Sequence, residues 1–220
     1  SDDAFISFQY ASNLARGHGL VFNPGERVWG FTSPLQTLLL GVLSTIGLGT
    51  IRSAYVTGFL WVAATGVLRH LLMAKVLPRI PSFCLALFFL LDAAQHGPYA
   101  MESGLLVALQ LGFLLAATER RARWANILAA LACLARPDSL LLVLPILLMD
   151  RQARRWASLA WFVGIGMAWE AFAYLYYGAL VPNSLAAKSG LSAFGVFFGN
   201  AFAHVTGMTF ATRLGFPAQA

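Results

Sequence analysis

Four long runs of residues without a single charge constrain this chain more than any other feature of its sequence. The runs are residues 54–68, 83–91, 105–118 and 140–149. Several of them approach the roughly 20 apolar residues that a helix needs to cross about 30 Å of hydrocarbon. Composition agrees, since 59% of the 220 residues are hydrophobic and only 11% are charged, about half the charged share of a typical soluble domain. The sequence therefore predicts an all-α, polytopic transmembrane helix bundle.

The net charge of +6 arises from basic residues that lie in short clusters between the apolar runs. The first cluster contains Arg69, Lys75 and Arg79, the second is the stretch ERRAR at 119–123, and the third is DRQARR at 150–155. Together they hold nine of the 15 Lys and Arg, and the positive-inside rule places such connections in the cytoplasm. The charge therefore indicates the orientation of the helices in a membrane and argues against a nucleic-acid partner.

Counting crossings from these connections gives an expected topology. Residues 52–73 run inward, 80–92 outward and 101–118 inward again, so Glu102 begins its helix on the outer side. Residues 34–50 then have both ends outside, and their 17 residues with Gly and Pro predict a surface-lying or re-entrant helix. We expect the opening polar loop to lie outside as well.

Residues 124–149 lie between two basic clusters and are too short for two full crossings. Pro137 disfavours helix at the preceding residue and cannot donate a backbone hydrogen bond. We expect a hairpin of two short helices with the sequence RPDS at its tip. The alternative is one continuous, kinked span in which Arg136 and Asp138 form an internal ion pair.

We interpret the chain as one transmembrane module. Residues 1–52 form an external loop with a surface helix, 53–177 the membrane helices, and 178–190 a second external loop, while 191–220 have no informative pattern. Because the chain opens on a polar loop with no leading span, we expect a fragment truncated at both ends.

The expected topology gathers Asp2, Asp3, Glu102 and Lys188 on the outer face, with Arg136 approaching from the membrane. Carboxylates opposite cations suit a transfer reaction on a phosphate-bearing lipid. One carboxylate can take the proton of an acceptor hydroxyl, and the cations can balance charge on a phosphate leaving group. Structural alternatives stay open, since the aspartates and Glu102 could only stabilise helix N-termini and Arg136 could only pair with a neighbour.

Four motifs occur in order between residues 2 and 188. They are DDAFISFQYASNLARGHGLVFNPGERVWGFTSPL at 2–35, MESGLL at 101–106, ARPDSLLL at 135–142 and YYGALVPNSLAAK at 176–188. Together they resemble the GT-C superfamily of polytopic glycosyltransferases, in particular bacterial arabinofuranosyltransferases, aminoarabinose transferases and protein O-mannosyltransferase-like enzymes. The resemblance implies inverting transfer of a sugar from a polyprenyl-phosphate donor to an envelope lipid, glycan or protein outside the cytoplasmic membrane.

The resemblance also implies roles for individual residues. Asp2 matches the general base, Asp3 its supporting neighbour and Glu102 the second external carboxylate. Arg136 and Lys188 fall where cations approach the donor phosphate. Further candidates for acceptor contacts are His96, Tyr177 and Asn183. Some relatives use a divalent metal, Mg²⁺ or Mn²⁺, for which Asp3 and Glu102 would be the ligands here. Trp29 and Gln36 depart from the polar and aromatic residues expected at their positions, which leaves the acceptor open.

Two other classes of protein compete with the enzyme. A lipid or solute transporter places its charges near the membrane midplane, often within inverted repeats, whereas the acids here are expected at the outer interface and no repeat is visible. A non-catalytic membrane assembly protein would use the carboxylates only at helix ends. The ordered motifs favour the glycosyltransferase.

Overall fold

The computed structural model describes residues 2–96, 102–179 and 182, with side chains for all of these except 2, 3 and 90–96. The described residues form helices and no strand, which confirms the all-α prediction for this part of the chain. The helices are α1 (Asp2–Ala15), α2 (Pro34–Leu43), α3 (Thr50–Met73), α4 (Arg79–His96), α5 (Ser103–Thr118), α6 (Ala122–Ala135), α7 (Leu140–Met149) and α8 (Trp156–Tyr177).

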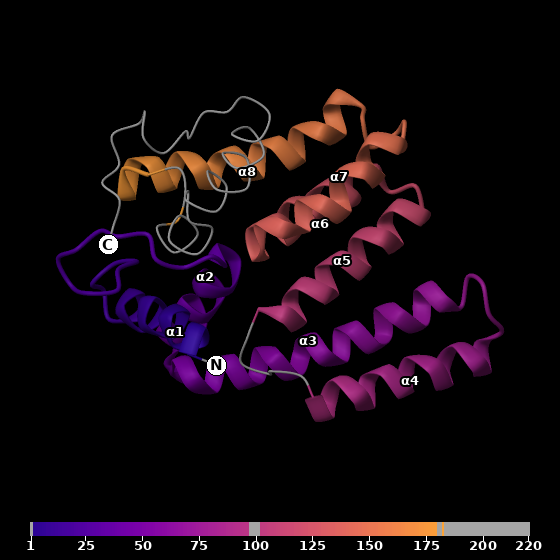
Figure 1. Ribbon diagram of the computed structural model, residues 1–220, viewed down its shortest axis with the longest axis horizontal. Helices are drawn as coiled ribbons and strands as arrows, with labels where there is room; N and C mark the ends of the chain where they lie inside the picture. The colour runs from indigo at the N-terminus through magenta and orange to yellow at the C-terminus, as the bar shows by residue number, and fades with distance from the viewer. Residues whose placement is uncertain (1, 97–101, 180–181, 183–220) are drawn as a thin grey trace, which may run out of the picture.

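The longer helices pack side by side in a layer of alternating direction (Figure 1). Helix α3 contacts α4 and α5, α5 contacts α6, and α6 contacts α8. The connections α3–α4, α5–α6 and α7–α8 therefore lie at one end of the molecule, while α1, α2 and the last turn of α8 lie at the other. The three basic clusters occupy the first of these ends, as the expected topology requires.

Two of the described helices, α3 with 24 residues and α8 with 22, are long and apolar enough to cross a membrane. At 1.5 Å per residue they measure about 36 and 33 Å, against about 30 Å of hydrocarbon. The other apolar helices are shorter, so further crossings remain a prediction. Only a small share of the apolar stretch of each long helix is buried within the protein, 17% in α3 and 11% in α8.

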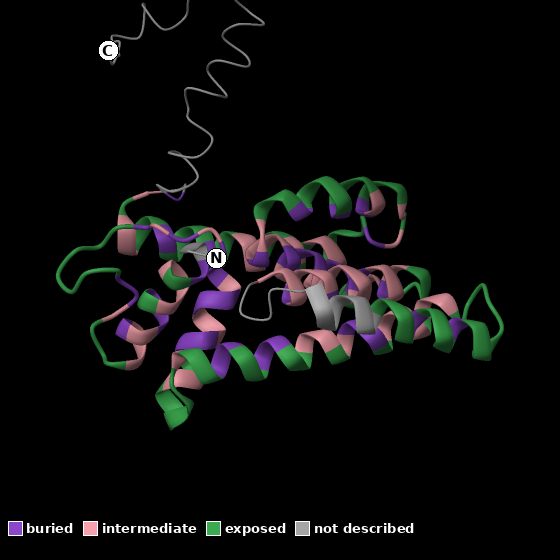
Figure 2. Cartoon of the chain, turned by 60° about the horizontal axis from the view of Figure 1, so that its bottom comes forward, coloured by how far each residue is buried: buried purple, intermediate pink, exposed green. Residues whose placement is uncertain are grey.

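Exposed residues also occur along the helices other than α3 and α8 (Figure 2), and many of them are apolar. Leu141 on α7 is 82% exposed and Ile80 on α4 is 78% exposed. A soluble monomer rarely presents continuous apolar surface of this kind, because contact with water is unfavourable. The outward faces of the helices are therefore suited to lipid.

The predicted surface helix is short in the structure. Helix α2 has Pro34 in its first turn, which suits a proline that needs no helical donor. It continues as a wider turn, η1 (Ser44–Leu48), in which Gly47 has a φ of 93°. This left-handed conformation ends the helix, and the 15 residues from Pro34 to Leu48 measure about 22 Å. Their length agrees with the expectation that they do not cross.

The hairpin prediction for residues 124–149 is confirmed and the continuous span is wrong. Arg136 has an extended backbone (φ −155°, ψ 129°), as a residue before proline prefers, and η2 (Pro137–Ser139) turns the chain. The Nδ2 group of Asn126, near the start of α6, then donates to the carbonyl of Ala153, 3.1 Å away and beyond the end of α7. The two helices therefore return to the same end of the molecule.

Small residues explain how closely α6 packs against its neighbours. Val143 and Leu147 from α7 and Phe113 from α5 belong to the core cluster that α6 joins. Small side chains let helix backbones approach closely, which gains dispersion contacts where lipid provides no hydrophobic driving force. The buried face of α6 is nearly all alanine, and the residues concerned are Ala125, Ala129, Ala130, Ala132 and Ala135.

We predict that Glu26→Cys and Arg154→Cys are labelled from opposite sides of the membrane. In a background with Cys84→Ala and Cys133→Ala, a membrane-impermeant maleimide added to intact cells or spheroplasts should modify the thiol introduced at position 26 in the opening loop. It should reach the thiol introduced at position 154 only after permeabilisation, because the two positions lie at opposite ends of the helices. Labelling of both positions from the same side would contradict the topology.

Candidate functional site

The opening loop, residues 16–33, is fixed to α1 by two buried side chains. The Tyr10 hydroxyl donates to the Val28 carbonyl at 2.6 Å and accepts from the Gly30 N–H at 3.0 Å. Asn13 donates through Nδ2 to the carbonyls of Val21 and Phe22 at 2.9 and 2.7 Å. Burial raises the pKa of the Tyr10 hydroxyl above its usual range, although the hydrogen bond with Gly30 lowers it.

The same loop is fixed to the end of α8. The Tyr176 hydroxyl accepts from the Leu20 N–H at 3.2 Å, and the Tyr177 hydroxyl donates to the Leu20 carbonyl at 2.7 Å. Gly19 has a φ of 89°, and a Cβ at this position would lie 2.5 Å from the Tyr176 hydroxyl. Glycine is thus required here both by backbone conformation and by the close approach of α8. The opening loop and the last turn of α8 are therefore joined, although they lie far apart in the sequence.

An aromatic cluster fills the space between the loop and α8. The Trp29 ring stacks on Tyr177 with 5.9 Å between ring centroids and meets Trp169 edge-on at 5.7 Å. Phe31 and Tyr10 belong to the same buried cluster. Trp29 departs from the polar residue expected at its position, and the structure shows that it is buried in this packing.

An open groove lies between α1 and the turn that leads into α3. Its volume is about 880 Å³. The apolar side chains that line it are Phe5, Ile6, Phe8, Phe22, Leu48 and Ile51. Polar groups are contributed by Gln9, Ser12, Thr50 and Arg52. An apolar groove with a guanidinium among its lining residues can accept a molecule with a hydrocarbon part and an anionic part.

The structure places Asp2 and Asp3 in the first turn of α1. Residues three, four and seven apart share one face of a helix, so the backbone of Asp2 lies in line with Phe5, Ile6 and Gln9 of the groove. The side chains of the two aspartates lie outside the described residues, and their predicted roles stay predictions.

Glu102 occupies the N-cap position of α5, but its side chain makes no capping hydrogen bond. It is half-buried. Close contact between the helices holds this end of α5, since a Cβ added to Gly104 would lie 3.2 Å from Trp61 on α3. Capping by the Glu102 carboxylate is therefore not what the structure shows, although a helix N-terminus still favours its charge. Its place beside the aspartates stays a prediction.

Arg136 and Asp138 pair at the tip of the hairpin, with 3.2 Å between Nη2 and Oδ2. Their side chains are 42% and 56% exposed, and an exposed pair of this kind contributes at most about 1 kcal/mol. Arg136 can therefore exchange its partner for another anion. Leu134, two residues earlier, packs against the aromatic cluster, so the tip lies at the loop end of the molecule.

The remaining predicted residues divide into two groups. Asn183 and Lys188 lie outside the described residues, as does the side chain of His96. Tyr177 is described, and its hydroxyl is bonded to the Leu20 carbonyl. In this conformation Tyr177 positions the loop and does not offer its hydroxyl to an acceptor.

Sequence reasoning missed Arg52 and the aromatic end of α8. Arg52 is the first charge after the surface helix and opens a long apolar helix, and this position was a usable signal. The stretch WEAFAYLYY at 169–177 is an aromatic-rich helix end, typical of the membrane–water interface. Neither signal shows which residues lie next to Arg52 or to the aromatic end of α8, because the contacts join distant parts of the chain.

The chain is similar to the terminal β-(1→2)-arabinofuranosyltransferase of Mycobacterium tuberculosis (strain ATCC 25618 / H37Rv). The two sequences are 30% identical over 218 residues, which cover 86% of this chain and 34% of the relative. The chain thus spans about a third of the length of the relative that it matches. No family model matches the chain, and no solved structure does. The similarity supports a distant relationship to glycosyltransferases in general.

We predict that Tyr10→Phe destabilises the protein by about 1–3 kcal/mol, because the Val28 carbonyl and Gly30 N–H lose a partner in a buried place. Thermal unfolding in detergent measures this, and Tyr55→Phe, which removes an exposed hydroxyl, is the control.

The pH dependence of stability gives a second test of the same hydroxyl. Its raised pKa means that the protonated form is favoured in the folded state. The stabilising contribution of Tyr10 is therefore present below about pH 10 and lost as pH rises further. The wild type should lose stability more steeply above about pH 10 than Tyr10→Phe does, and equal slopes would contradict the role of this hydroxyl.

Proposed function

We propose that this chain belongs to a GT-C-type membrane glycosyltransferase, which moves a sugar from a polyprenyl-phosphate donor to a cell-envelope acceptor outside the cytoplasmic membrane. One observation carries the proposal: the helix that begins with the acidic pair also lines an apolar groove that contains Arg52. The similarity to an arabinofuranosyltransferase supports the reaction class.

The shape and lining of the groove suit a lipid-linked donor. An isoprenoid chain is long and apolar, so it needs an open channel lined by aromatic and aliphatic groups, such as Phe5, Phe22 and Ile51. A phosphate needs a cation with several donors, and a guanidinium can donate two parallel hydrogen bonds to it. Arg52 meets this requirement at the edge of the groove where α3 begins. We therefore add Arg52 to Arg136 and Lys188 as a cation for the donor phosphate.

The acidic pair would supply the proton transfer. Asp2 accepts the proton of the acceptor hydroxyl as that oxygen attacks the anomeric carbon of the donor sugar. The bond between this carbon and the phosphate oxygen breaks, and the electron pair leaves with the lipid phosphate, whose charge the cations stabilise. Attack opposite the leaving group inverts the anomeric configuration. Asp3 supports Asp2, and Glu102 orients the acceptor hydroxyl.

The remaining predicted contacts concern the acceptor and a metal. His96 and Asn183 stay candidates for acceptor contacts, whereas Tyr177 acts by holding the loop. A divalent metal, Mg²⁺ or Mn²⁺, stays a prediction with Asp3 and Glu102 as its ligands. Among the described side chains, no group of three or more His, Cys, Asp or Glu could hold a metal ion, and the Asp3 side chain is outside that set.

We predict that Asp2→Asn in the full-length protein lowers sugar transfer by at least about 100-fold, because general-base catalysis contributes about that much or more. The assay incubates membranes with labelled polyprenyl-phosphate sugar and measures label in the envelope acceptor. Glu26→Gln, which changes an exposed carboxylate in the opening loop, is the matched control and should keep full activity. Normal turnover by Asp2→Asn would refute the base assignment. Movement of the label across the membrane without bond cleavage would instead support the transporter.

We predict that Arg52→Gln raises the KM for the lipid-linked donor by about 10- to 100-fold, which is the loss expected for a hydrogen bond to a charged group. Arg52→Lys should recover part of this, because lysine keeps the charge but loses the planar pair of donors. Arg16→Gln, a change at an exposed arginine that does not line the groove, serves as control. An unchanged KM for Arg52→Gln would remove this residue from the donor site.

A further inference from the structure

The end of the molecule opposite the groove carries a strong positive charge. The connections that carry the three basic clusters lie at this end (Figure 1). Lys75 from the first cluster lies 3.3 Å from Glu119 in the second. Arg123 from the second cluster lies over the ring of Trp161 in α8, 4.5 Å from its centroid, beside the third. Nine cations and two carboxylates, Glu119 and Asp150, belong to these clusters. We call this end the basic face.

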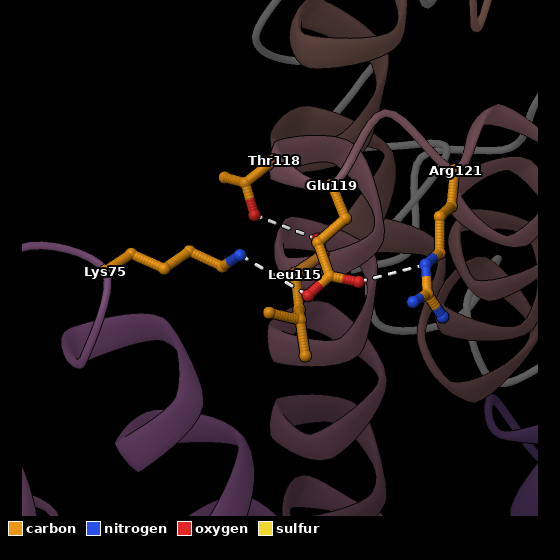
Figure 3. A network of polar contacts seen from close by, with 5 residues as sticks. All are labelled: Lys75, Leu115, Thr118, Glu119 and Arg121. Carbon is orange, nitrogen blue, oxygen red and sulfur yellow. Dashed lines mark hydrogen bonds and ion pairs between the residues drawn. The ribbon is translucent and has the colours of Figure 1, made fainter.

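Both carboxylates of the basic face are already engaged within the protein. Figure 3 shows Glu119 between Lys75 and Arg121, with its oxygens 3.3 Å from Lys75 Nζ and 3.0 Å from Arg121 Nε. Asp150 accepts a hydrogen bond from the Gln152 N–H at 2.8 Å through Oδ1, which shapes the turn before α8. Glu119 is therefore already paired with two cations, and Asp150 adds a single negative charge against the seven cations that remain.

Three of the remaining cations are arginines that lie close together in the turn between α7 and α8. Arg151, Arg154 and Arg155 are exposed, and none forms an ion pair with a residue that the structure describes. Their backbones are ordered by hydrogen bonds of the turn, such as the one from the Arg154 N–H to the Asp150 carbonyl at 3.1 Å. The turn thus presents three guanidinium groups within one short stretch of chain.

Apolar side chains beside these arginines indicate the kind of partner. Trp156, the next residue in the chain, is 86% exposed, and Met149 just before the turn is exposed as well. Trp124, at the start of α6, adds a second exposed indole. Tryptophan rings concentrate at the level of lipid headgroups, where one part of the ring is apolar and the other polar. A soluble anion would use the arginines but leave these side chains in water.

We propose that the basic face binds anionic phospholipid headgroups, with Arg151, Arg154 and Arg155 as the principal phosphate contacts and Met149, Trp124 and Trp156 against the glycerol and acyl region. Clusters of Lys and Arg next to membrane helices attract anionic lipids in this way. The site is separate from the groove and from the acidic pair, so it does not depend on the proposed sugar transfer. Its occupant is a membrane lipid of the surrounding leaflet.

The test compares lipid binding by the full-length protein in neutral detergent. Phosphatidylglycerol and phosphatidylcholine with the same acyl chains are titrated, and bound lipid is counted by native mass spectrometry. We expect the wild type to prefer phosphatidylglycerol and to lose that preference as salt is raised. Soluble glycerol phosphate should compete poorly, because it has no apolar part. Equal binding of both lipids, or equally strong competition by glycerol phosphate, would overturn the proposal.

Matched variants separate the charge from the fold. Arg151→Gln, Arg154→Gln and Arg155→Gln together should weaken phosphatidylglycerol binding by about 100-fold, at roughly fivefold for each arginine. The triple change to Lys keeps the charges and should keep the preference. Thermal unfolding of both variants without added lipid shows whether they are folded.

The proposal would also be overturned by a folded Gln variant that still prefers phosphatidylglycerol, or by a Lys variant that loses this preference. The salt dependence of lipid binding by the wild type tests the proposal without any variant.

Discussion

The cost of placing a guanidinium group in hydrocarbon governs this molecule. On insertion scales an arginine at the centre of a spanning helix costs about 2.5–3.5 kcal/mol. The chain meets this constraint by placing nine of its 15 basic residues in three connections. Because successive helices alternate in direction, connections that are two helices apart return to the same end. The opening loop, the groove and the N-terminal turn of α5 are thereby assigned to the other end.

The second constraint on the fold is that the polar opening loop, residues 16–33, lies against an apolar helical body. Its backbone N–H and C=O groups need partners wherever water is excluded. Tyr10 and Asn13 provide them from α1, and Tyr176 and Tyr177 provide them from α8. The three tyrosines are amphipathic, so each one packs its ring among aromatic neighbours while its hydroxyl satisfies the loop. A glycine-rich loop can therefore keep a defined shape beside the acidic start of α1.

Much of the helical framework could be predicted from local sequence. Uncharged runs, basic clusters and Pro137 indicated the helices, their common ends and the hairpin, because each feature acts on its own neighbourhood. The hairpin and the Arg136–Asp138 pair were expected as alternatives, yet both occur. An ion pair between residues two positions apart forms as readily in a tight turn as in a kinked helix.

The site could be predicted only in part, because it depends on contacts between distant segments. The partnership of Leu20 with Tyr176 and Tyr177 follows from packing that no local pattern encodes, as does the position of Arg52 in a groove beside α1. Trp29 shows the same limit: its type suggested an altered acceptor site, and its surroundings show a buried ring. The side-chain positions of the remaining candidates stay predictions, and these are Asp2, Asp3, His96, Asn183 and Lys188.

The attachment of Leu20 to the last turn of α8 also determines when the loop can reach its final form. Leu20 leaves the ribosome 156 residues before Tyr176 does. Its backbone groups must wait for their partners until the intervening helices have been synthesised, and closing so long a segment is a late and entropically costly step. The opening loop thus gains its attachment to α8 only after α3 to α8 have been made.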